Sequence, residues 1–178
     1  MAKALEVLKR AQSAYRNAGL EQAYRQLGLD QKLLESKTVA DIAVELDLHE
    51  AALARFLCAM CFLGLVKKVG HQKYKHIKLK NYSTDASRWL FWMINEFVAE
   101  KIHSDQFVLE NKENIDCCLH LGLLEPVEDK YRIPFEIETY FSPASGDYLG
   151  PLCQHYQRIM MHFFSPEIII NALKSNQS

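Results

Sequence analysis

The sequence lacks a long apolar run, a large net charge and a dense set of cysteines. Its longest apolar run, residues 56–66, is well short of the roughly 18 residues that a membrane span needs. Basic residues number 21 and acidic residues 22, so the overall basic charge typical of nucleic-acid-binding domains is missing. Charged residues interrupt positions 1–16, which is not typical of a signal peptide. We therefore expect a cytoplasmic protein that does not associate with membranes.

The five cysteines give little support for a disulfide framework or a metal site. Their number is odd, and we expect free thiols in a reducing compartment. Cys58 and Cys61 form a CxxC pair inside an apolar helical segment, whereas zinc-binding pairs normally lie on tight turns. The adjacent pair Cys117 and Cys118 lacks ligand spacing. We therefore expect no bound metal. A redox or metal sensor that uses Cys58 and Cys61 is an alternative function.

Known catalytic and cofactor motifs are also missing. The seven glycines never have GxGxxG or GxGxG spacing, so no cradle for a phosphate or cofactor is predicted. No GxSxG motif is present. His103 and Asp105 have the HxD spacing of an iron site, but they fall at an expected helix end, where histidine is favoured independently. We predict no catalytic residue and no cofactor bound by this chain alone, and participation in an enzyme is left open.

Apolar residues recur at helical spacing near the N-terminus and again after residue 38. The first pattern covers residues 4–27, with an expected break near Gly19 and an end at Gly28. Thr38 and Asp41 then have the spacing of a capping box, which predicts the start of a second helix. These signals predict a mainly helical N-terminal region.

The next stretch predicts a helix followed by a hairpin. The helix is expected over residues 50–63, ended by Gly64, and its apolar residues on every side indicate that it is buried. Residues 65–69 and 73–79 predict two strands, joined by a turn at 70–72. Helix, turn, helix and hairpin is the order of a winged helix.

The C-terminal half predicts more helices and a weaker echo of that pattern. Residues 121–127 resemble 63–69, so a second wing at about 121–133 is either a degenerate repeat or a chance similarity. Residues 134–147 are predicted to be a loop. A helix is expected over about 147–164, and Ser165 and Pro166 are typical of the start of another.

The whole pattern predicts a mainly α fold with small β-hairpin wings and C-terminal helices. We expect two regions. Residues 1–82 would form a helical dimerisation segment and the winged helix. Residues 83–178 would form a helical segment with a long helix from Thr84 and the degenerate second wing.

Positions 20–75 contain a set of mostly apolar residues that is typical of one enzyme family. These residues are Leu27-Gly28-Leu29, Thr38-Val39-Ala40-Asp41-Ile42-Ala43, Leu46, Leu48, Leu53, Phe56-Leu57, Leu63-Gly64-Leu65 and Tyr74. With these residues the segment resembles the N-terminal dimerisation domain of small-molecule O-methyltransferases that use S-adenosylmethionine. Residues 140–164, with Tyr148-Leu149 and an aromatic helix, resemble the segment that follows the wing in that family. The resemblance implies a homodimer whose two subunits interlock, and a wall of the acceptor pocket.

The sequence departs from that family in one main respect. The catalytic half, a Rossmann-like domain, has no counterpart here, and the chain stops about where that domain would begin. We therefore expect a non-catalytic dimerisation and acceptor-pocket module of an O-methyltransferase-like biosynthetic protein, either a piece of a longer enzyme or a stand-alone relative. Its expected partners are a second copy of the chain and either a small aromatic ligand or a methyltransferase catalytic domain.

Aromatic residues are more numerous in two predicted helices than one small core needs. One helix carries Trp92, and the other carries His155, Met161 and Phe164. The resemblance implies that these four residues line the acceptor pocket. Trp92 and Phe164 would form flat walls, Met161 an adaptable wall, and His155 a polar group that orients an acceptor hydroxyl. Alternatively, these side chains fill the core or a dimer interface.

A different class of function is a winged-helix transcriptional regulator. Its nucleic-acid contacts would come from the lysine-rich wing, with Lys73, Lys75, Lys78 and Lys80 on phosphates. The helix over residues 50–63 has almost no polar side chains that could read base edges. We therefore expect no sequence-specific DNA partner, and solvated lysines are the simpler interpretation.

Overall fold

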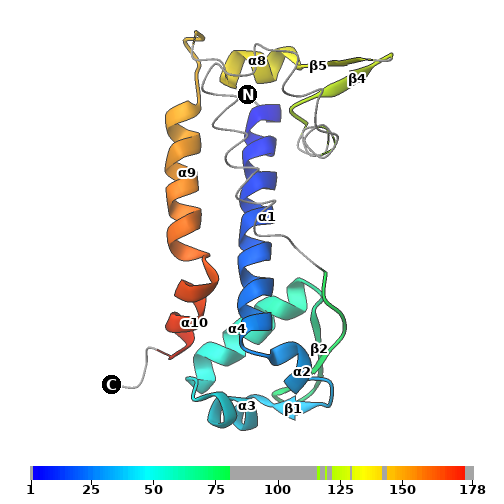
Figure 1. Ribbon diagram of the computed structural model, residues 1–178, viewed down its shortest axis with the longest axis vertical. Helices are drawn as coiled ribbons and strands as arrows, with labels where there is room; N and C mark the ends of the chain where they lie inside the picture. The colour runs from blue at the N-terminus through cyan, green and yellow to red at the C-terminus, as the bar shows by residue number, and fades with distance from the viewer. Residues whose placement is uncertain are drawn as a thin grey trace. The chain divides into compact units, whose positions relative to one another are not determined.

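The computed structural model describes residues 2–80, 116, 119, 122–128, 130–141 and 144–174. The described part of the chain is mainly helical with small antiparallel sheets, which confirms the expected mainly α class (Figure 1). It divides into two compact units. The first unit comprises Met1–Tyr15 and Asp85–Ile159, and the second comprises Arg16–Thr84 and Met160–Ser178. The predicted boundary after residue 82 and the helix expected from Thr84 lie outside the described residues.

Helix α1 runs from Ala2 to Gln26 without the break that we predicted near Gly19. A single glycine is tolerated inside a helix at a cost of roughly 1 kcal/mol, so the hydrogen-bond pattern continues through it. Gly19 is buried, and a Cβ there would lie 1.9 Å from the backbone oxygen of Phe164. The absence of a side chain at Gly19 therefore allows the backbone of Phe164 to pack closely against α1. The predicted helix end is confirmed by Gly28, whose φ of 65° is left-handed.

The second unit continues with three more helices and the first strand. These are α2 (Leu29–Lys32), β1 (Lys37–Thr38), α3 (Val39–Leu46) and α4 (Glu50–Phe62). The capping box is confirmed, because Thr38 Oγ1 accepts a hydrogen bond from the Asp41 backbone N–H at 3.1 Å. In the turn before α4, Asp47 adopts a left-handed conformation, and His49 Nδ1 caps the helix by accepting from the Ala52 N–H at 3.3 Å.

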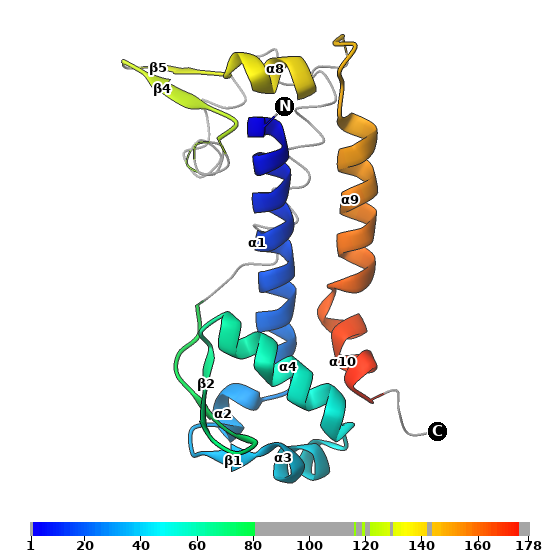
Figure 2. The ribbon, with the colours of Figure 1, turned by 180° about the vertical axis from the view of Figure 1, so that it is seen from behind.

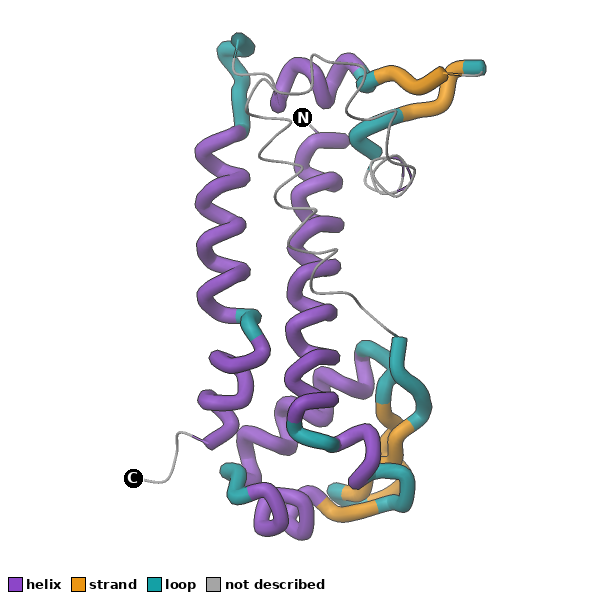
Figure 3. The backbone as a smooth tube through the Cα atoms, viewed as in Figure 1, coloured by secondary structure: helices purple, strands orange, loops and turns teal. Residues whose placement is uncertain are grey.

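Gly64 ends α4 as predicted. With φ of 71° it allows Leu65 N–H to bond Met60 O and its own N–H to bond Cys61 O, which is the Schellman pattern. The chain then forms the antiparallel strands β2 (Val66–Gly70) and β3 (Lys73–His76), and β3 is shorter than the predicted 73–79. The sheet order is β1-β3-β2, with the short strands drawn in orange in Figure 3. The two-residue β1 was not predicted.

The core of the second unit lies between its helices and this sheet. Its fully buried side chains include Tyr24, Ile42, Leu57 and Leu65. Helix α10 (Pro166–Lys174) adds Leu173, whose backbone oxygen accepts a bond from the His49 N–H at 3.0 Å. Figure 2 shows the helices and the sheet of this unit from behind. The predicted start of α10 is confirmed by Ser165, whose Oγ accepts a hydrogen bond from the Ile168 N–H.

The first unit contains the second predicted hairpin and a helix that we did not predict. Strands β4 (Glu125–Val127) and β5 (Lys130–Arg132) pair antiparallel, which confirms a hairpin at this position. The expected loop over 134–147 is wrong in its first half, where α8 runs from Phe135 to Phe141. The Pro134 oxygen accepts the first helical bonds, and the fully buried Ile137 gives this short helix an apolar side. Helix α9 follows at Gly150–Phe163.

No helix among the described residues is long and apolar enough to cross a membrane.

Candidate functional site

The predicted pocket residues are only partly described. Trp92 lies outside the described residues. His155 and Met161 are exposed on α9, six residues apart and so about 120° apart around the helix. Phe164 follows α9 and is half-buried. The acceptor pocket therefore stays a prediction.

The cysteine pair lies on α4, and the surroundings of Cys61 disfavour its thiolate. Cys58 is exposed, and its Sγ lies 3.8 Å from the Tyr74 hydroxyl. Burial and the neighbouring Cys58 raise the pKa of Cys61. Because the thiolate is the metal ligand and the nucleophile, a raised pKa lowers reactivity. Among the described residues, no group of three or more His, Cys, Asp or Glu side chains could hold a metal, and Cys117, Cys118, His103 and Asp105 lie outside them.

Sequence reasoning missed two buried polar contacts that join α1 to the hairpin. Tyr24 is fully buried, and its hydroxyl lies 3.0 Å from His76 Nδ1. Burial raises the pKa of Tyr24. Glu21 is also buried, and its Oε1 accepts bonds from the Lys80 backbone N–H at 3.0 Å and from Arg25 at 2.9 Å. The sequence signal that could have revealed this contact was Glu21, a carboxylate next to the apolar positions Leu20 and Tyr24 of α1. These contacts position the hairpin.

Helix α4 has an exposed apolar side, so the prediction that it is buried on every side is wrong. Ala51, Arg55, Cys58 and Phe62 are exposed and follow one another at helical spacing. Phe62 is 93% exposed. The opposite side, which includes Leu53 and Leu57, packs into the core. One small domain buries only one side of this helix, and we call the exposed four residues the α4 stripe.

The three-stranded sheet carries a lysine-rich outer face. Lys67 and Lys75 lie directly opposite each other, and their side chains therefore share one face. Lys73 lies two residues from Lys75 and shares this face as well. All three side chains are exposed, as are those of Lys78 and Lys80. The sheet thus separates a core side, which carries Tyr74, from a basic side.

Ion pairing distinguishes these lysines from others in the same unit. Lys32 and Lys37 both contact Glu45, at 2.5 and 2.9 Å, and these hydrogen bonds lower the pKa of that carboxyl to about 2. By contrast, none of the described acidic side chains forms an ion pair with Lys67, Lys73 or Lys75. The outer face therefore presents uncompensated positive charge.

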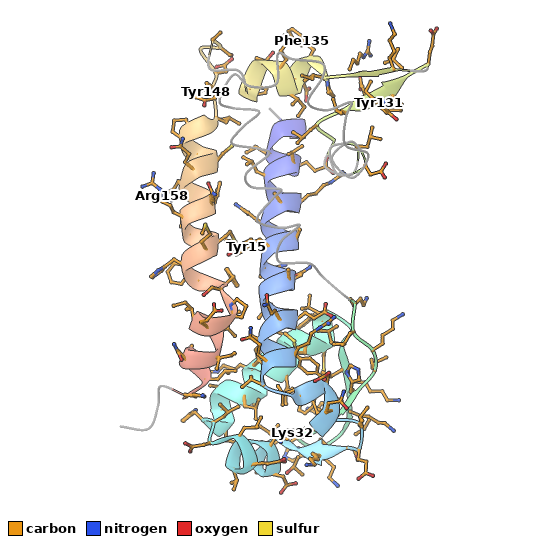
Figure 4. The ribbon with its side chains drawn as sticks, viewed as in Figure 1. Tyr15, Lys32, Tyr131, Phe135, Tyr148 and Arg158 are labelled. Atoms are coloured by element: carbon orange, nitrogen blue, oxygen red, sulfur yellow. The ribbon has the colours of Figure 1, made fainter. Side chains whose placement is uncertain are left out.

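Exposed aromatic residues also occur in the first unit. Tyr131 on β5 is 41% exposed and Phe135 at the start of α8 is 80% exposed (Figure 4). Beside them, Arg132 pairs with Glu125 across the hairpin. This hairpin therefore carries an ion pair between its two strands, whereas no ion pair joins the described residues of β2 and β3 in the second unit.

Comparison of the chain with protein-family models, curated proteins and solved structures finds no match. Function is therefore inferred from two surfaces of the second unit, the α4 stripe and the lysine-rich outer face of the sheet.

Proposed function

We propose that the second unit contains a winged helix and that this chain is a non-catalytic dimerisation module of an O-methyltransferase-like biosynthetic protein. The order helix, strand, helix, helix, strand, strand supports the winged-helix interpretation. The pairing of β1 with β3 supports it further, because the wing then belongs to a three-stranded sheet. The acceptor-pocket role rests on the sequence resemblance alone.

The observation that carries the dimerisation proposal is the exposure of Phe62. A phenylalanine side chain gains about 1.5–3 kcal/mol when it is fully buried, so a ring that is 93% exposed leaves this free energy unused. Cys58 and Ala51 extend the same apolar stripe, and Val44 on α3 is 84% exposed. Extended apolar surfaces of this kind usually mark interfaces.

A second copy of the chain fits this stripe better than a charged partner does. Between Ala51 and Phe62 only Arg55 is charged, and interface centres are depleted of charge. In a dimer with two-fold symmetry the same surface of each subunit forms the interface, so the apolar stripe of one subunit contacts that of the other. Arg55 can pack its aliphatic part against the partner while its guanidinium stays in water. Closed dimers of this type are the commonest oligomers.

The α4 stripe also weighs against a sequence-specific regulator. Reading base edges in the major groove requires hydrogen-bonding side chains on the helix that enters it. Arg55 is the only residue of the stripe with strong donors, and Phe62 and Cys58 offer none. We therefore favour dimerisation over specific DNA recognition.

Light scattering and sedimentation of the full chain test the proposal. We expect a dimer at micromolar concentration and a monomer after Phe62→Asp. The variant should still fold, because the Phe62 ring is exposed within a single chain. Phe135→Asp is the matched control, since this ring is also largely exposed but lies in the first unit, and this variant should remain dimeric. A wild-type monomer, or a dimeric Phe62→Asp variant, would refute the proposal.

A further inference from the structure

The hairpin of the second unit has an arrangement of charge that lowers its own stability. Lys67 and Lys75 occupy directly opposite positions of an antiparallel pair, where side chains are close and like charges repel. Residues 66–80 contain six lysines and no acidic residue. Elsewhere in the same unit, Glu45 forms ion pairs with Lys32 and Lys37, so an acidic side chain neutralises those two lysines. An anion that lies over the outer face would remove the repulsion.

We propose that the outer face of the β1–β3–β2 sheet binds the phosphate backbone of duplex nucleic acid without sequence selectivity. This activity goes beyond the dimerisation proposed above and uses a different surface. Lys73 and Lys75 lie along one strand, about 7 Å apart, and Lys67 lies beside them on the next strand. A pair of cations along one strand, with a third beside it on the next, suits a regularly charged linear polyanion.

The surroundings of the lysines favour a duplex over a single strand. Proteins that bind single strands stack bases on exposed aromatic rings. Tyr74 is the only Phe, Tyr or Trp residue of β2 and β3, and it is 3% exposed and belongs to the core. The imidazole ring of His76 is stacked on Tyr24. The outer face therefore offers charge but no ring for stacking.

The same surroundings favour nucleic acid over an anionic membrane. Binding at a membrane surface normally combines basic residues with large apolar side chains that enter the lipid, such as Trp, Phe or Leu. Beside the lysines, Val69 and Ile77 are the large hydrophobic side chains in this stretch that are exposed, and neither is aromatic. Electrostatic contacts thus dominate, and phosphate contacts of this kind carry no sequence information.

Fluorescence anisotropy of the full chain with a labelled 20-base-pair duplex tests the proposal. At about 50 mM salt we expect binding in the micromolar range, equal for two unrelated sequences and lost by about 200 mM salt. The triple variant Lys67→Gln, Lys73→Gln, Lys75→Gln should bind at least about tenfold more weakly. The slope of log affinity against log salt should decrease by about 2–3, because each lost phosphate contact removes roughly 0.9.

The matched control changes the same net charge at other exposed lysines: Lys9→Gln, Lys130→Gln, Lys174→Gln. It should bind the duplex like the wild type, and circular dichroism should show that both triple variants are folded. Equal losses in the two triple variants would overturn the proposal, because net charge alone would then explain the binding. Strong preference for one sequence would overturn it too. Binding to phosphatidylserine vesicles without binding to the duplex would assign the face to membranes.

Discussion

Two hairpins of this chain begin in the same way and end in different environments. Each follows a Leu-Gly-Leu sequence whose glycine, Gly64 or Gly122, is left-handed, with φ of 71° and 79°. Each glycine N–H bonds the carbonyl three residues earlier, and each turn contains a left-handed non-glycine residue, Gln72 or Glu128. Local chemistry therefore produced the second hairpin, as the sequence echo predicted. That this hairpin is a second wing stays a prediction.

Burial separates the two hairpins. In the second unit β1 adds a third strand, and Tyr74 becomes 3% exposed against the core. Among the described residues of the first unit the sheet has two strands. Tyr131 pairs with Pro126 as Tyr74 pairs with Lys68, and Tyr131 is 41% exposed. A hairpin can thus form from its turn and its preceding glycine, but packing decides which of its side chains contribute to stability.

The largest difference is expected when the equivalent tyrosines are truncated. Tyr74→Ala should lower the free energy of unfolding by about 3–5 kcal/mol, because it opens a cavity in the core. Tyr131→Ala should change it by no more than about 0.5 kcal/mol, since its ring is partly solvated and lies at the surface. Chemical denaturation of both variants measures this. Equal losses would mean that the two hairpins are packed alike.

Alkaline pH should reveal the same contrast through Tyr74. Burial raises the pKa of Tyr74 to about 12 from the usual 10, so the folded state retains the proton longer than the unfolded state. Its contribution is complete below pH 10 and is lost as the pH rises from about 10 to 12. Tyr74→Phe should lose less stability than the wild type over this interval. Thermal melts at pH 9 and pH 11 measure the difference, and parallel curves would exclude this linkage.

The two glycines should respond alike, because their backbone conformations are alike. Gly64→Ala and Gly122→Ala should each cost about 1–2 kcal/mol, since an alanine is strained at these φ values. Neither added Cβ meets an atom closer than 3.5 Å, so strain rather than a clash sets the cost. Differential scanning calorimetry checks both variants. A cost at only one site would show that the echo does not extend to energetics.

Charge reversal across each hairpin should have the smallest effects, with opposite signs. Lys67→Glu replaces repulsion of Lys75 with attraction and should stabilise by about 0.2–1 kcal/mol. Arg132→Glu places two carboxylates opposite each other, because Glu125 is the cross-strand partner, and should destabilise by a similar amount. Urea midpoints at low salt measure both. Destabilisation by Lys67→Glu would show that Lys67 makes a favourable contact.

Local sequence signals predicted most of the elements correctly. The Thr38 capping box, the Gly64 end of α4 and the start of α10 at Pro166 all agree with the structure. The turn predicted at residues 70–72 is shorter, because Gly70 belongs to β2. Each signal acts within about six residues, through one cap or one left-handed residue. Errors arose where burial decided the outcome, as for α8, in which Ile137 is fully buried.

The candidate surfaces were only half predictable. The lysines between residues 67 and 80 are visible in the sequence, but the opposition of Lys67 and Lys75 follows from strand register. The apolar composition of α4 suggested a fully buried helix, whereas the structure buries one side and exposes Phe62. Composition cannot distinguish these outcomes, because burial depends on how many neighbours the rest of the chain supplies.

The sequence by itself determined where helices and turns begin and end, since caps, left-handed glycines and apolar spacing act locally on the backbone. The tertiary structure alone decided four things: the close approach of Phe164 to Gly19, the pairing of β1 with β3, the burial of Glu21 and the exposure of the α4 stripe. In each case the deciding atoms belong to segments far apart in the chain. The carbonyl of Phe164 can approach position 19 because glycine has no Cβ, and the buried Glu21 accepts a bond from the backbone of Lys80; no local pattern records either contact.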